Sequence, residues 1–205
     1  MASTRRIFAL LILVFIATRP LPTAEAADSA LGPALGPATP LSASEAELVA
    51  GAQARFGELG LDSLRGVVVS FHEDVAQCNG NLGLSTVEDD SPRLRICWSS
   101  DDPGVRRILQ EQALVHELAH VWLDENVDET TREEFVEITG SGSWRLQGTA
   151  WGERGIERAA ELLTWAVLDP PVLFVDTETV ACELWAEGYT VLTRQPAPDT
   201  VTNCR

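Results

Sequence analysis

A five-residue motif with the side chains of a metal site lies near the middle of the chain. His116-Glu117-Leu118-Ala119-His120 has the pattern HExxH. Residues four positions apart lie on one face of a helix, so both imidazoles can reach one metal ion. Glu117 stands beside them, where it can take a proton from a water on that ion. The motif therefore predicts one zinc ion, held by His116 and His120, with Glu117 as the general base.

The third protein ligand that a catalytic zinc needs is not set by this motif. The longer motif HExxHxxGxxH is excluded, because Leu123 and Asn126 occupy the positions of its glycine and third histidine. His72 is one alternative ligand. A carboxylate is the other, since Glu157 and Glu161 lie one helical turn apart in a largely apolar stretch. Acids there are costly unless they are paired or bind metal, so one can bind the ion while the other orients a histidine.

Two helices must present these side chains. An Asp-Asp-Pro sequence is typical of a helix start and predicts a helix over residues 103–123. A second helix is expected over residues 156–168, where an Asp-Pro-Pro sequence ends it. Strands are expected at residues 66–71 and 94–98, with turn chemistry over residues 78–85 between them. This order predicts an α+β fold, with a small twisted sheet, an active-site helix carrying HExxH and a second helix carrying the Glu ligand.

The N-terminus has the features of an export signal. Residues 1–26 combine two early arginines, an apolar run and small residues before a cleavage point. The apolar run is shorter than the roughly 20 residues that span a bilayer, so we expect no stable membrane insertion after cleavage. Residues 27–43, rich in Ala, Pro, Gly and Leu, are expected to be a linker or pro-segment, and residues 44–205 the functional domain. The protein is predicted to be secreted or extracytoplasmic.

The chain has four cysteines, and export would make disulfides of them. The pairs closest in sequence are expected, Cys78 with Cys97 and Cys182 with Cys204. The first pair would join two neighbouring strands, and the second would fix the C-terminal tail to a helix. A zinc site made of cysteines is not expected, because no CxxC occurs.

The charge balance excludes one class of partner. All 15 basic residues are arginines, and the net charge is −16. Binding to nucleic acid needs a basic surface, which this composition does not supply. We expect the protein to be a monomer whose partner is a peptide or protein substrate.

An HExxH motif followed by a helix with Glu-x-x-x-acid resembles the gluzincin branch of the zincin metallopeptidases, here in a minimal single-domain form. The resemblance implies that Glu157 is the third zinc ligand and that Glu161 supports a histidine ligand. The long interval after His120 leaves Glu161, Glu153 or even Glu137 open as the ligand instead.

The same resemblance implies how the protein would act. It would be an exported zinc metallopeptidase that hydrolyses peptide bonds, with extended substrate bound along the edge of the strand at residues 93–98. Tyr189 or His72 would be the side chain that stabilises the transition state. Two alternatives stay open: a non-catalytic binding module of zincin fold with a structural zinc, and a disulfide-stabilised exported interaction protein in which the motif is accidental.

Overall fold

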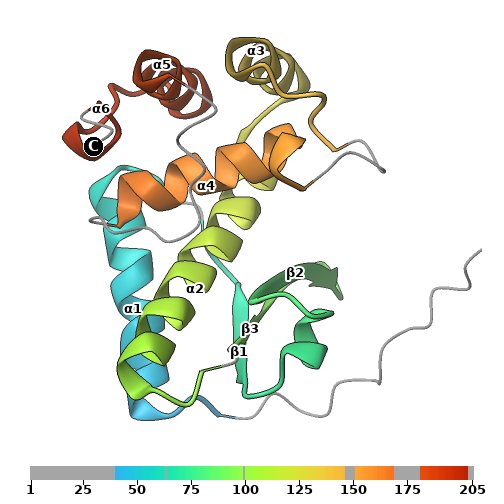
Figure 1. The fold of residues 1–205 in the computed structure, drawn as a ribbon, viewed down its shortest axis with the longest axis vertical. Helices are drawn as coiled ribbons and strands as arrows, with labels where there is room; N and C mark the ends of the chain where they lie inside the picture. Colours follow the sequence, from blue (N-terminus) through green and yellow to red (C-terminus); the bar gives the residue numbers. More distant parts are fainter. Residues whose placement is uncertain (1–39, 63, 99, 146–150, 169–180, 203–205) are drawn as a thin grey trace, which may run out of the picture. The chain divides into compact units, whose positions relative to one another are not determined.

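Three strands and six α-helices form the described part of the chain, which comprises residues 40–62, 64–98, 100–145, 151–168 and 181–202 of the computed structural model (Figure 1). The α-helices are α1 (Ala43–Glu58), α2 (Pro103–Asn126), α3 (Glu129–Thr139), α4 (Gly155–Val167), α5 (Cys182–Thr193) and α6 (Asp199–Thr202). The strands are β1 (Val68–His72), β2 (Gly83–Glu88) and β3 (Ser91–Cys97), and two short 3-10 helices are η1 (Val75–Cys78) and η2 (Trp151–Glu153). The predicted α+β class is confirmed.

The sheet is mixed, with the order β1-β3-β2. β1 runs parallel to β3, and β2 runs antiparallel to β3, to which a tight turn connects it. Within the described part of the chain, β3 is therefore paired on both sides, whereas β1 and β2 are the two edges. This order decides which strand can offer backbone groups to a ligand.

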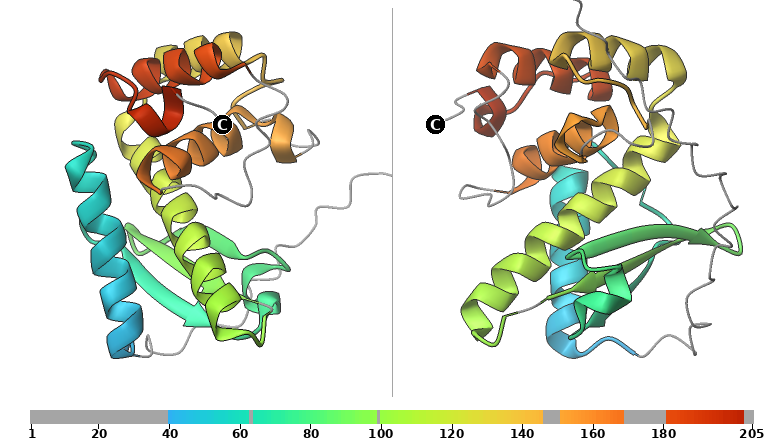
Figure 2. Two further views of the ribbon diagram at one scale, coloured as in Figure 1. Left: turned by 60° about the vertical axis from the view of Figure 1, so that its left-hand side comes forward. Right: turned by 45° about the vertical axis from the view of Figure 1, so that its right-hand side comes forward.

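Helix α2 lies at the centre of the fold. Asp102 caps it by accepting hydrogen bonds from the backbone N–H groups of Gly104 and Val105, and Pro103 occupies its first turn. The helix packs on the sheet along one face, and α4 crosses its C-terminal half on another (Figures 1 and 2). α3 and α5 lie on the side of α4 that faces away from the sheet.

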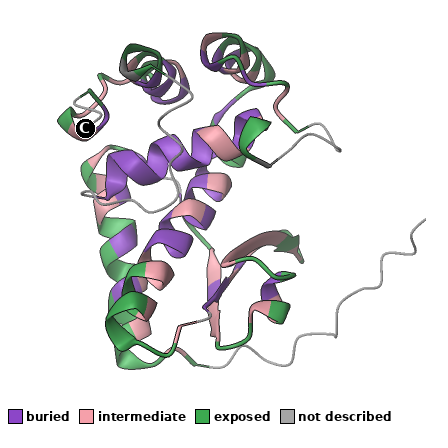
Figure 3. Ribbon diagram, viewed as in Figure 1, coloured by how far each residue is buried: buried purple, intermediate pink, exposed green. Residues whose placement is uncertain are grey.

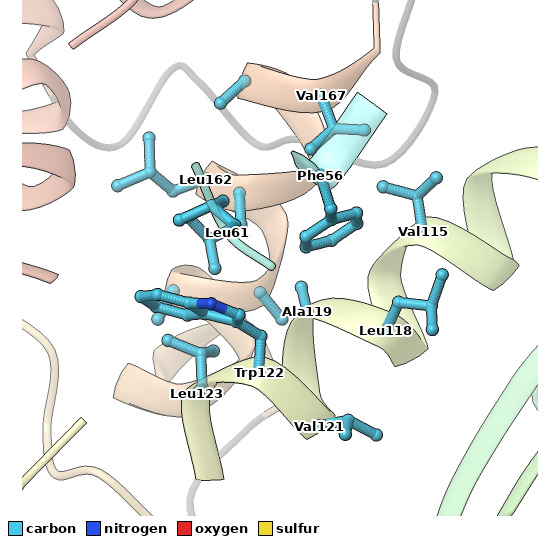
Figure 4. Packing of buried hydrophobic residues seen from close by; sticks show 14 of the residues in the cluster. Phe56, Leu61, Val115, Leu118, Ala119, Val121, Trp122, Leu123, Leu162 and Val167 are labelled. Atoms are coloured by element: carbon cyan, nitrogen blue, oxygen red, sulfur yellow. The ribbon is translucent and has the colours of Figure 1, made fainter. Parts of the chain in front are cut away.

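Burial is concentrated where α2 and α4 meet, as the purple segments of Figure 3 show. Eleven of the 13 residues of α4 are buried, so this helix is covered nearly all round. Phe56 of α1 and Leu61 fill the space beside α2 and α4, close to Ala119 and Trp122 (Figure 4). This apolar packing fixes the crossing of α2 and α4, and with it the positions of the polar side chains that both helices carry.

Several predicted bounds differ from the structure. The strand expected at residues 94–98 is β3, which already begins at Ser91. The turn expected over residues 78–85 ends early, because β2 begins at Gly83 and pairs along its length with β3. Gly83 and Ser85 are poor strand formers, and the pairing with β3 overrides their local preference. The helix expected to start at residue 103 does so, but it continues to Asn126, three residues beyond the predicted end.

Cys78 and Cys97 form the predicted disulfide. It joins the 3-10 helix η1, and not a second strand as expected, to the end of β3. Cys204 lies outside the described residues, so the pair of Cys182 and Cys204 stays a prediction. Residues 1–39, which include the predicted signal and most of the predicted linker, also lie outside them. The last residues of that linker, 40–43, are described and lead into α1, which begins at Ala43. None of the described helices is long and apolar enough to cross a membrane.

Removing this disulfide is expected to cost stability. The bond closes a loop between cysteines 19 positions apart, and a cross-link of that size stabilises a domain by about 3 kcal/mol, chiefly by restricting the unfolded chain. Replacing both cysteines by alanine should therefore lower Tm by about 6–12 °C. Thermal unfolding followed by circular dichroism measures the change. A change below about 1 °C would contradict the expected role of the bond.

Candidate metal centre

The crossing of α2 and α4 brings two histidines and a glutamate together. His116 and His120 lie one turn apart on α2, and Glu157 lies in the first turn of α4. The two histidine Nε2 atoms are 3.1 Å apart. The Oε2 atom of Glu157 is 3.3 Å from Nε2 of His116 and 3.2 Å from Nε2 of His120. Among the described residues, these three form the group that could hold a metal ion.

The dimensions of this triangle suit a tetrahedral ion. Two ligands that each lie about 2.0–2.1 Å from a tetrahedral zinc are about 3.3 Å from one another, which matches the three observed separations. Three electron-pair donors that converge in this way repel each other unless protons or a cation lie between them. Imidazole nitrogen and carboxylate oxygen are also the ligand types that zinc prefers.

Glu157 is held as a carboxylate. Burial raises its pKa, but hydrogen bonds from the two imidazoles and their positive charge outweigh burial and lower the pKa to about 2. The ionised form is the one that binds a metal ion. The cluster therefore presents Glu157 in its ligand form at any physiological pH.

Glu117 lies on the same helix but turns toward the sheet. Its side chain is buried, and the backbone N–H of Ser85 on β2 donates a hydrogen bond to its carboxylate. Burial raises its pKa to about 7, the neighbouring charge of Glu157 adds to the rise, and His116 and the Ser85 N–H oppose it. A pKa near 7 suits a general base at neutral pH.

A cavity of about 550 Å³ opens on the cluster. Most of its wall comes from three segments: residues 81–85 at and before the start of β2, one face of α2, and the face of α4 that carries Glu157. His116 and His120 keep 16% and 12% of their side-chain surface exposed, which is enough to border the cavity. The three candidate ligands are thus accessible from one side and covered by protein on the others.

The acids proposed from the sequence separate into two groups. Glu157 is in the cluster, and Glu161, one turn further along α4, is buried and lines the same cavity. Glu153 and Glu137 are exposed and belong neither to the cluster nor to the cavity wall. Of the four candidates for the third ligand, the structure places Glu157 beside the histidines.

The structure does not bring His72 or Tyr189 to the site. His72 ends β1, at the sheet edge opposite to β2, where its Nε2 atom lies 2.9 Å from Oγ of Ser70. Tyr189 is on α5 and is fully buried in the core. Neither lines the cavity, and His72 is not in the group of side chains that could hold a metal ion, so the structure lends no support to the expectation that either acts there.

The strand expected to bind substrate also changes. Residues 93–98 fall largely in β3, which is paired on both sides and has no open edge. The strand beside the cavity is β2. Along β2 the backbone N–H and C=O groups of successive residues point alternately toward β3 and toward the open edge. The carbonyl of Leu82 accepts a hydrogen bond from the backbone N–H of Cys97 in β3. The backbone groups of Gly83, Ser85 and Val87 therefore face the open edge.

Several cavity residues were missed in the sequence. Gln112 lies one turn before His116, and Arg154 lies one turn before Glu157, so helical spacing could have indicated both. Arg145 lines the cavity too and pairs with Asp124. No local signal points to Gly83 or Ser85, because their place beside Glu117 depends on how β2 packs against α2.

Comparisons with known protein families, with curated proteins and with solved structures found no match to this chain. The function is therefore inferred from the geometry of the site and the resemblance of its motif.

Proposed function

We propose that the protein is a zinc-dependent hydrolase in which His116, His120 and Glu157 hold one zinc ion. The observation that carries this proposal is the triangle of ligand atoms, 3.1–3.3 Å on each side, at the wall of an open cavity. Structural zinc sites are closed by four protein ligands, whereas catalytic sites have three and leave a position for water or substrate. The three-ligand group and the cavity favour the catalytic kind over a structural zinc in a binding module.

The chemistry would be divided between the ion and the chain. A zinc ion bound here would lower the pKa of a water molecule and polarise a substrate carbonyl. Glu117 would take the proton of the attacking water and pass it to the leaving group. The Ser85 N–H holds the Glu117 carboxylate in place for this task. Glu161, buried one turn from Glu157, would orient a histidine ligand.

The substrate we propose is a peptide, which makes the protein a metallopeptidase of the zincin class. The open edge of β2 borders the cavity and offers the backbone groups of Gly83 and Val87 and the carbonyl of Ser85, whose N–H is bonded to Glu117. An extended peptide can add to such an edge as a further strand, which would bring one of its carbonyls to the cluster. The gluzincin resemblance of the HExxH and Glu157 segments points to the same reaction.

We also propose that the enzyme is exported. The signal features of residues 1–26 carry this proposal, and the Cys78–Cys97 disulfide supports it, since such bonds persist in oxidising compartments.

Metal analysis of the purified exported chain tests the proposal. We expect one zinc ion per chain, hydrolysis of an internally quenched peptide library, and loss of both after treatment with 1,10-phenanthroline. The double variant His116→Ala/His120→Ala should bind no zinc. The His72→Ala variant is the matched control, because this histidine lies across the sheet from the site, and it should keep both metal and activity.

Other outcomes would decide between the alternatives. Absence of any stoichiometric divalent metal would contradict the metal site itself. One zinc per chain without hydrolysis of any peptide would favour the non-catalytic binding module. Unchanged folding of the double histidine variant, with no metal in the wild type, would favour the interaction protein.

A further inference from the structure

Gly83, the first residue of β2, lies directly against the side chain of Glu117. A Cβ atom added to Gly83 would be 2.6 Å from Cγ and 2.8 Å from Cδ of Glu117. Carbon atoms that are not bonded pack at about 3.5–4.0 Å. The three nearest atoms to that Cβ all belong to Glu117, and none belongs to a metal ligand.

Space, and not backbone conformation, is what requires glycine here. The described glycines with positive φ are Gly60, Gly66, Gly80 and Gly140. Gly83 has an extended backbone that any residue could adopt, and it pairs regularly with Ile96 of β3. A side chain at position 83 is therefore opposed first by Glu117, to which the three nearest atoms belong.

Glu117 cannot make room for a side chain at position 83 without leaving its contact with β2. The side chain of Glu117 is buried. Ser85, two residues after Gly83 on β2, donates its backbone N–H to the carboxylate. The two contacts come from one strand, one by hydrogen bonding and the other by close approach. An added methyl group at position 83 would displace the carboxylate or push β2 away from it, and either change breaks this arrangement.

We propose that Gly83 is a positioning residue for Glu117, since the missing side chain lets β2 close onto the carboxylate and hold it at the cavity wall. The contact itself is independent of the reaction, whereas its catalytic consequence rests on the proposed function. The metal ligands lie on α2 and α4 outside this contact, so a change at Gly83 should disturb Glu117 and spare metal binding.

A double-mutant cycle tests the contact without any substrate. Gly83→Ala alone should lower Tm by about 3–10 °C, because it overpacks a buried site. In the Glu117→Ala background, where Cγ and Cδ are gone, the same substitution should leave Tm unchanged or raise it. A purely structural role of Gly83 would give the same loss in both backgrounds, and that result would overturn the proposal. If Gly83→Ala does not fold but the double variant does, the proposal is supported.

The Gly51→Ala variant is the matched control for this cycle. Gly51 lies on α1, and a Cβ there would meet nothing within 4 Å. Its effect on Tm should be identical with and without Glu117. Coupling between position 51 and Glu117 as large as that of Gly83 would show that the cycle reports a global change.

A second measurement tests the catalytic consequence. With the quenched peptide library as probe, Gly83→Ala should keep one zinc per chain and lose at least about 100-fold in kcat, with KM within about threefold. Hydrolysis at the wild-type rate by this variant would overturn the positioning role. If the wild-type chain neither binds metal nor hydrolyses peptide, the proposed function fails, while the cycle still decides whether Gly83 positions Glu117.

Discussion

Replacing Glu117 by glutamine is expected to lower the rate of peptide hydrolysis by about 10²–10⁴-fold, the range that general-base catalysis contributes. The amide has nearly the shape of the carboxylate but cannot accept the proton of the attacking water. Glu117 is not one of the three residues of the metal cluster, so the zinc content of the variant should stay at the wild-type value. Single-turnover rates on a quenched peptide, together with metal analysis of the same sample, measure both quantities.

The control for this variant is Glu125→Gln, the same substitution on an exposed position of the same helix. Its rate should lie within about twofold of the wild type. If the Glu117→Gln variant retains full activity, Glu117 is not the base and the proposed mechanism fails. If it loses zinc as well, the carboxylate contributes to metal binding in a way that the cluster geometry does not show.

Replacing Glu157 by glutamine is expected to weaken zinc binding by more than about 100-fold, which exceeds the effect of losing a partner outside the ligand set. Of the three ligands only Glu157 is anionic, and its oxygen lies within 3.3 Å of both histidine nitrogens. Removing its charge leaves two neutral imidazoles to hold a dication. Competition titration against a fluorescent zinc chelator gives the dissociation constants.

Two neighbouring variants make this assignment specific. Glu161→Gln should weaken zinc binding by about 10–100-fold, as expected for a residue that only orients a ligand. Glu153→Gln should have no effect, since Glu153 is exposed and outside the cavity. A larger loss in Glu161→Gln than in Glu157→Gln would exchange the roles of the two acids.

Local sequence patterns were sufficient for several features of this protein. The HExxH helix starts where the Asp-Asp-Pro sequence predicts, because capping and proline placement act within one turn. The disulfide between Cys78 and Cys97 follows from the short interval between the two cysteines. The position of α4 follows from its dense apolar run, which makes its burial predictable.

The strand β2 shows where local patterns fail. Gly83 and Ser85 are typical of turns, and the chain around them is not strongly apolar, yet pairing with β3 makes the segment a strand. Because β2 pairs with β3, the open edge of the sheet beside the cavity belongs to β2, and not to β3 as the sequence suggested. It also places Gly83 and Ser85 against Glu117, which no spacing within the sequence indicates.

The sequence by itself determined that His116 and His120 can share one ion, because the pitch of a helix places residues four apart on one face. It also limited the third ligand to a few side chains. Only the tertiary structure shows which of these side chains lies beside the histidines, since Glu157 reaches them through the packing of α4 across α2 and His72 is held at the far edge of the sheet. Contacts between residues distant in sequence depend on how whole elements pack, and local propensity carries no information about that packing.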